Sequence, residues 1–189
     1  MAASKFDIAS RALVRIGAKP IASFDDGTAE AIAAGREYEA AASGALTMHR
    51  WRFASDQQVL VALEETPHDV WAYALQLPSD LLVLHTVRAG GVIVPYDRYG
   101  DKIFCDYRED VVASYTFRVP EYRWPPYFVD AFTVAFAATM AMAVASNVEM
   151  ARELREEAEK RLWPRARFLD SEQQTTRRLF RSRLLARRF

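Results

Sequence analysis

The stretch PPYFVDAFTVAFAATMAMAVASN, residues 125–147, is the most apolar part of the chain and decides its fold. Asp130 is the only charged residue between Tyr127 and Ser146. The two prolines suit the first turn of a helix, and Asn147 suits either the exit or the cap of the next helix. A helix that is apolar all round is a membrane span or a core helix. Because alanine dominates and Asp130 lies inside, the composition favours the central helix of a soluble bundle.

Three amphipathic helices are predicted around this central helix. Residues 4–16 carry apolar side chains at helical spacing, with Ser4 as the cap. Residues 29–50 form an alanine-rich second helix, which Asp26 or Thr28 can cap. Residues 148–163 form the fourth helix, and we expect Pro164 to end it.

Between the second and third helices the pattern changes to short β-branched and aromatic runs separated by turn signals. We expect about five antiparallel strands, with one hairpin turning near Tyr99-Gly100-Asp101. The predicted fold class is therefore α+β: a four-helix bundle with an antiparallel β-module inserted between helix 2 and helix 3, plus an extended C-terminal tail. The corresponding domains are residues 1–56 and 121–164 for the bundle, 57–120 for the β-module, and 165–189 for the tail.

Charge is distributed unevenly along the 189 residues, although the net charge is zero. Residues 165–189 hold eight arginines against Asp170 and Glu172, a net charge of +6, so the rest of the chain carries −6. The single cysteine, Cys105, excludes an internal disulfide. The first residues lack the apolar core of a signal peptide, so we expect synthesis in the cytoplasm.

The tail combines arginine with large apolar side chains, which is typical of a segment that docks. Guanidinium groups pair with carboxylates or phosphates, and apolar side chains fill pockets. The partner can be an acidic, grooved protein surface or a nucleic acid backbone. The predicted docking residues are Arg177, Arg178, Leu179, Phe180, Arg181, Arg183, Leu184, Leu185, Arg187, Arg188 and Phe189.

Side chains that could carry catalysis or bind a metal are scattered. No histidine has a second ligand at the spacing that zinc requires, so we expect no metal and no cofactor. Adjacent carboxylates in loops do not point to a common site, and the glycine pair reads as a turn rather than a phosphate loop. We therefore predict no enzymatic activity. The residues weighed are His49, His68, His85, Cys105, Asp25, Asp26, Glu64, Glu65, Gly90 and Gly91.

The order of several segments resembles the head-to-tail adaptors of tailed bacteriophages. These segments are SKFDIASRALVRIGAKPIASFDDGTAEA near the start, then HRWRFA, then WAYALQLPSDLLVL, and finally YRWPPYFVDAF at the apolar helix. The nearest group is tail tubular protein A of short-tailed phages, together with the adaptors of gene transfer agents. The resemblance covers about residues 4–163, and the tail matches only in kind.

The resemblance implies a structural virion protein of the neck. Twelve copies would form a ring under the portal protein, with the tail segments docked on the portal and the next tail component below. DNA would pass through the central channel without sequence-specific binding, and no membrane would be involved. A body charge of −6 suits a channel through which DNA slides.

Two other functions compete with this hypothesis. The first is a DNA-binding protein that uses the arginine-rich C-terminal arm, whose affinity would fall steeply with salt. The second is a tail enzyme that degrades polysaccharides, which would need paired carboxylates in a cleft. The exposed aromatic residues of the β-module can be contacts between ring subunits or simply its small core. These residues are Trp71, Tyr96, Tyr99, Tyr107 and Tyr122.

Overall fold

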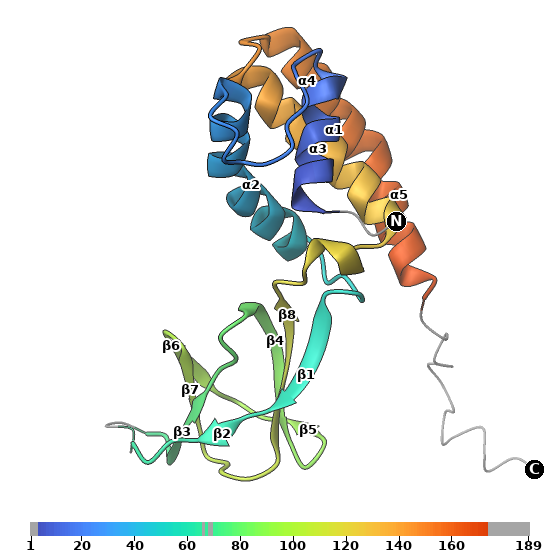
Figure 1. Ribbon diagram of the computed structural model, residues 1–189. Helices are drawn as coiled ribbons and strands as arrows, with labels where there is room; N and C mark the ends of the chain where they lie inside the picture. The colour runs from blue at the N-terminus through green and yellow to red at the C-terminus, as the bar shows by residue number, and fades with distance from the viewer. Residues whose placement is uncertain (1–3, 66, 68–69, 174–189) are drawn as a thin grey trace, which may run out of the picture.

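The computed structural model describes residues 4–65, 67 and 70–173 of the chain (Figure 1). The fold is α+β, as predicted. Helices α1 (Lys5–Arg15) and α2 (Ala29–Thr47) precede the strands, and α3 (Pro126–Ala143), α4 (Val148–Glu157) and α5 (Trp163–Ser171) follow them. All five pack together at one end of the molecule, and two small sheets form the other end. Segments far apart in sequence thus build one helical layer.

The predicted helix caps are largely present. Ser4 and Asp7 form a reciprocal capping box at the start of α1, where Asp7 N donates to Ser4 Oγ at 3.1 Å. Thr28, rather than Asp26, caps α2 by accepting from Ala31 N at 3.1 Å. Asp26 instead stabilises the preceding loop, because its carboxylate accepts a hydrogen bond from Ala22 N at 2.8 Å.

Helix α3 forms the centre of the helical core. Its three phenylalanines, Phe128, Phe132 and Phe136, are spaced by four residues, lie on one face and are at most 1% exposed. The helix ends at Ala143, four residues before Asn147. Ser146 has a φ of 48°, a left-handed conformation that no helix continues. Asn147 then caps α4 by accepting from Met150 N at 3.0 Å.

The expectation that Pro164 ends the last helix is wrong. Residues Ala158–Leu162 form a π-helical turn, and α5 continues beyond it to Ser171. A proline has no N–H and its ring clashes with the carbonyl four residues earlier. Pro164 lies at the first turn of α5, where the missing N–H costs little, directly after the wider π turn. The arginine-rich region therefore begins inside a helix.

The β-module contains more and shorter strands than the five predicted, because runs of two or three residues pair between longer strands. The first sheet has the order β1-β8-β4-β5 and the second β2-β3-β7-β6, with every pair antiparallel. The predicted hairpin at Tyr99-Gly100-Asp101 joins β6 to β7. The strand bounds are β1 Ser55–Val59, β2 Val61–Ala62, β3 Tyr73–Gln76, β4 Leu81–Ala89, β5 Val92–Ile93, β6 Asp97–Tyr99, β7 Lys102–Cys105 and β8 Val111–Phe117.

A second apolar core fills the space between the sheets. Leu75, Ile103 and Cys105 of the second sheet meet Val87 and Val111 of the first, and all five are fully buried. Two of the aromatic residues weighed above, Trp71 and Tyr96, pack against this core, whereas the other three are exposed: Tyr99 by 54%, Tyr107 by 45% and Tyr122 by 65%. Packing in the core of the β-module therefore accounts for Trp71 and Tyr96 only.

Candidate functional site

The predicted docking residues, Arg177 to Phe189, lie outside the described residues. The described chain reaches Gln173, just past the end of α5, where the helical layer meets the sheets (Figure 1). The structure does describe the base of the arginine-rich segment, at the end of α5. We define this base as Asp170 with the two groups that hold it, Arg52 and Tyr127.

Asp170 is a buried carboxylate, only 1% exposed, that joins three segments. The backbone N–H of Arg52 donates to both of its oxygens, at 3.2 Å and 3.0 Å. The hydroxyl of Tyr127, in the first turn of α3, donates to Oδ1 at 2.9 Å. Burial first, and then this hydrogen bond to Asp170, raise the pKa of Tyr127 above its ordinary value, so the hydroxyl remains a donor.

Aromatic side chains pack next to this base. Trp51 is fully buried, and its indole N–H donates to Ala45 O at 2.9 Å. Its ring lies 5.1 Å from Phe128 on α3 and 5.9 Å from Trp163 on α5. The turn after α2 is therefore packed against both helices, and α5 has little freedom to move relative to the body.

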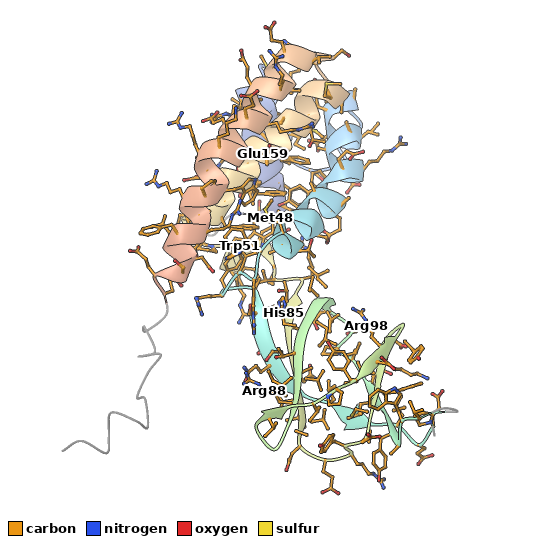
Figure 2. All side chains as sticks on the ribbon, turned by 180° about the vertical axis from the view of Figure 1, so that it is seen from behind. Met48, Trp51, His85, Arg88, Arg98 and Glu159 are labelled. Carbon is orange, nitrogen blue, oxygen red and sulfur yellow. The ribbon has the colours of Figure 1, made fainter. Side chains whose placement is uncertain are left out.

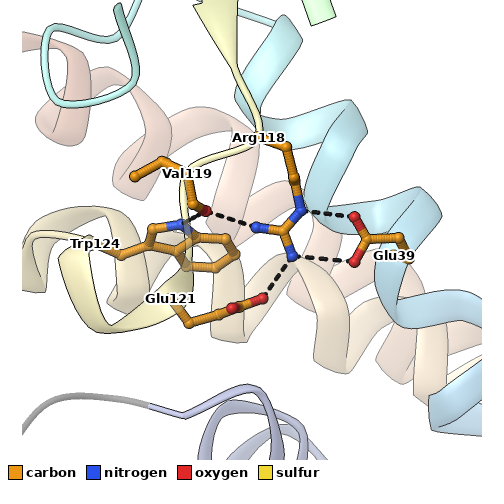
Figure 3. A network of polar contacts seen from close by, with 5 residues as sticks. All are labelled: Glu39, Arg118, Val119, Glu121 and Trp124. Carbon is orange, nitrogen blue, oxygen red and sulfur yellow. Dashed lines mark hydrogen bonds and ion pairs between the residues drawn. The ribbon is translucent and has the colours of Figure 1, made fainter. Parts of the chain in front are cut away.

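A second polar cluster ties the strands to the helices (Figure 3). Arg118, just after β8, donates two hydrogen bonds to the Glu39 carboxylate of α2, at 2.6 Å and 3.0 Å, and another to Glu121 at 2.6 Å. It also donates to Val119 O at 2.6 Å. The hydrogen bonds from Arg118 hold the pKa of Glu39 below its ordinary value. This cluster fixes the orientation of the β-module at its exit strand.

Two of the three histidines lie in the described chain, and each is partly buried. Burial lowers the pKa of His49, and the positive charges of Arg167 and Arg52 lower it further, against the opposing effect of Asp170. Burial also lowers the pKa of His85, with Arg50 as a further cause. The two rings belong to different elements. His68 lies outside the described residues.

The remaining candidate residues have structural roles. Asp25 and Asp26 hold their own loop through Ser23. Glu65 is ion-paired with Lys102. Burial raises the pKa of the Cys105 thiol, which makes it a poor nucleophile. Within residues 4–65, 67 and 70–173, no three His, Cys, Asp or Glu side chains are placed to hold a metal ion.

Two adjoining surface hollows lie along α3 and share Asp130 and Leu162. The lower one, of about 300 Å³, also borders α5, and the upper one, of about 470 Å³, borders α1 and α4. Glu157 in the upper hollow is ion-paired with Arg15 at 2.9 Å. Asp130 is the one carboxylate of these hollows without an ion pair to another described residue. Neither hollow presents a pair of unpaired carboxylates for acid–base chemistry.

Sequence reasoning missed the residues that build the base. In the sequence alone Asp170 is one of two acidic residues among the arginines of the tail, and no motif marks Arg118, Glu39 or Glu121. A signal for Asp170 does exist, because Trp163, Ala166 and Asp170 repeat at helical spacing and all three are buried.

Helix α3 is long and apolar enough to cross a membrane by length and composition, but 56% of that window is buried inside the protein. A core helix of a soluble protein passes the same test. No protein-family model matches the chain, and no curated protein matches it either.

Proposed function

We propose that the chain is a structural virion protein, a head-to-tail adaptor. Several copies form a ring under the portal and join it to the tail, and DNA passes through the central channel. The resemblance of four sequence segments supports this proposal, and each of those segments contributes buried residues to one of the two apolar cores. These residues are Leu13 and Ile16, Trp51, Leu75 and Leu77, and Trp124 and Phe128.

The proposed architecture is a four-helix bundle with an inserted β-module. Counting α4, the π turn and α5 as one continuous helix gives four helices, two on each side of the strands in sequence. In this proposal the arginine-rich segment is a separate docking arm. It leaves the bundle at the point where the bundle meets the β-module.

The observation that carries the proposal is the anchoring of this arm's base. Asp170 holds the end of α5 to the turn at Arg52 and to Tyr127 on α3. A docking segment gives affinity only where its starting point is fixed, because a fixed base raises its effective concentration at the partner. Many copies in a ring would multiply that effect, so arms that bind weakly one at a time would together hold the portal.

The test is a chain that ends after Gln173, compared with the full chain in capture by the portal protein of the same virus. Truncation must spare Asp170, since its loss would damage the body itself. We expect the truncated chain to melt at the same temperature and to lose portal binding. A control with all six tail arginines changed to lysine keeps the charge but removes bidentate pairing, and we expect it to bind more weakly. Undiminished capture of the truncated chain would refute the docking role.

DNA binding by the same arm is the competing proposal. It predicts that the full chain shifts duplex DNA in a gel at low salt and that the chain ending after Gln173 does not. Portal capture and DNA binding are measured on the same two proteins, so the two roles of the arm can be separated.

A further inference from the structure

The sheet β1-β8-β4-β5 has one face turned away from the apolar core, which we call the outer face. Val111, Ala113 and Val87 point inward and are buried, so their neighbours in each strand point outward. The pairing register sets outward residues side by side across the strands. One row is Val59, Val112, Arg88 and Ile93, the next is Gln57, Ser114 and Thr86, and the last is Ser55, Thr116 and Val83. Ser114 and Thr116, at the centre of the last two rows, are buried, so the accessible part of this face lies at the row of Arg88 and along the β1 edge.

This outer face contains no carboxylate in any of the three rows. Arg88 is exposed, and its guanidinium has no ion pair with another residue in the described part of the chain. The other outward side chains are apolar groups, the Gln57 amide and hydroxyls, of which those of Ser114 and Thr116 are buried. The face therefore carries one positive charge, that of Arg88, within a β-module that carries an excess of acidic residues elsewhere.

A β-bulge adds an imidazole ring to this face. The pairing of β4 with β8 shifts between Leu84 and Thr86, so His85 is the extra residue. Its Nε2 lies 2.8 Å from the hydroxyl of Thr116, which belongs to the outer face. Figure 2 shows His85 near the helical layer and Arg88 further down the same strand. They are three residues apart, about 10 Å along a strand.

Arg50 adds a second positive charge, just outside the sheet. It is exposed, it lies in the turn between α2 and β1, and its charge is close enough to lower the pKa of His85. It also has no ion pair with any other residue that the structure describes. Arg50 therefore lies near His85, and Arg88 follows three residues after His85 on β4.

We propose that Arg88 and Gln57 of the outer face, together with the neighbouring Arg50 and His85, contact the phosphate backbone of double-stranded DNA. The inference deepens the proposed function, on which the choice of double-stranded DNA rests, by naming the face that each copy turns toward the channel. It gives the body a DNA contact that is separate from the arginine-rich arm.

The chemistry of the face favours a nucleic acid backbone over an acidic protein. Phosphate contacts in protein–DNA complexes come from arginine together with serine, threonine, asparagine and glutamine side chains. The accessible groups of this kind here are Arg50, Arg88 and Gln57, with Ser55 and Thr86 partly exposed. One DNA strand carries a phosphate every 3.4 Å of helix axis, so groups about 10 Å apart can each meet one. The contacts would be to the backbone alone, so DNA could slide past without sequence preference.

The test measures the affinity of the full chain for a labelled 20-base-pair duplex between about 50 and about 200 mM salt, a range in which phosphate contacts change affinity strongly. We compare Arg50→Ala and Arg88→Ala with Arg98→Ala. Arg98 is the matched control, because it is an exposed arginine of the same module on β6 of the other sheet. Each face variant should weaken binding by on the order of tenfold at low salt and reduce the salt slope by about 1. Arg98→Ala should change neither the affinity nor the salt slope.

The proposal is overturned if the two face variants bind like Arg98→Ala, or if the full chain does not bind the duplex at about 50 mM salt, where backbone contacts are strongest. Failure here is distinguishable from failure of the adaptor function. The face variants keep the docking arm and should still be captured by the portal protein. Truncation after Gln173 tests only the docking role of the arm. Its result does not alter the expected difference in DNA affinity between Arg88→Ala and Arg98→Ala.

Discussion

The Tyr127 hydroxyl donates to the buried Asp170 carboxylate at 2.9 Å, which joins the first turn of the central helix to the last turn of α5. The two residues lie 43 positions apart in sequence. The same carboxylate accepts the backbone N–H of Arg52, in the turn that leads into the β-module. The helical layer, the β-module and the start of the arginine-rich arm therefore meet at one side chain.

Replacing Asp170 with alanine should destabilise the body strongly. The change removes the acceptor of Arg52 N and of the Tyr127 hydroxyl, and an unpaired buried donor costs about 1–3 kcal/mol. We expect the free energy of unfolding in urea to fall by about 3 kcal/mol. Asp130→Ala is the control, because Asp130 is exposed on the same face of the molecule as α5 and forms no ion pair with another described residue. Equal stability of the two variants would contradict the role given to Asp170.

Acid should weaken the link between α2 and the strand exit. The hydrogen bonds from Arg118 hold the pKa of Glu39 below its ordinary value of 4.5. A carboxyl group with a lowered folded-state pKa stabilises the fold above its unfolded pKa, and this stability is lost as the pH falls through the folded pKa. The melting temperature should therefore fall as the pH is lowered below 4.5.

At neutral pH the melting temperature of the variant Glu39→Gln should be lower than that of the native chain. On acidification the melting temperature of the variant should fall by less. Glu37→Gln, on the same helix and exposed, serves as the control and should follow the native chain. If acidification lowers the melting temperatures of the native chain and of Glu39→Gln by the same amount, the ion pair contributes nothing to stability. The effect should be small, because surface-exposed pairs contribute only about 0–1 kcal/mol.

Removing the hydroxyl of Tyr38 should not destabilise the fold. The residue is 2% exposed and packs edge-on against Phe132 and Phe136. Its hydroxyl makes no hydrogen bond of normal geometry to another residue that the structure describes, and burial first, then the nearby Glu121 carboxylate, raise its pKa above the ordinary value. Because a buried unpaired hydroxyl costs free energy, Tyr38→Phe should be as stable as the native chain or more stable by up to about 1 kcal/mol. A clear loss of stability would show that the hydroxyl has a partner.

Local signals in the sequence predicted the helices and their caps well. Ser4, Thr28 and Asn147 cap α1, α2 and α4 because a cap needs only a suitable side chain three residues before an N–H. The apolar pattern likewise identified α3 as a core helix. These features depend on neighbours within one turn, which a single sequence displays directly.

Features that depend on distant partners could not be predicted in the same way. Asp170 looked like a tail charge because its donors, Tyr127 and Arg52, lie 43 and 118 residues away. Pro164 suggested a helix end because the π turn before it has no sequence signature. Strands β2 and β5 contain two residues each and exist only through pairing, so the pattern of apolar runs could not show them.

Electron microscopy of the full chain with and without the portal protein of the same virus tests the proposed adaptor function most directly. We expect a closed ring of copies on the outer rim of the portal, with the segment from Arg177 to Phe189 lying against the portal and a channel for DNA along the ring axis. The contradicting result is a portal that carries no such ring when the full chain is present in excess.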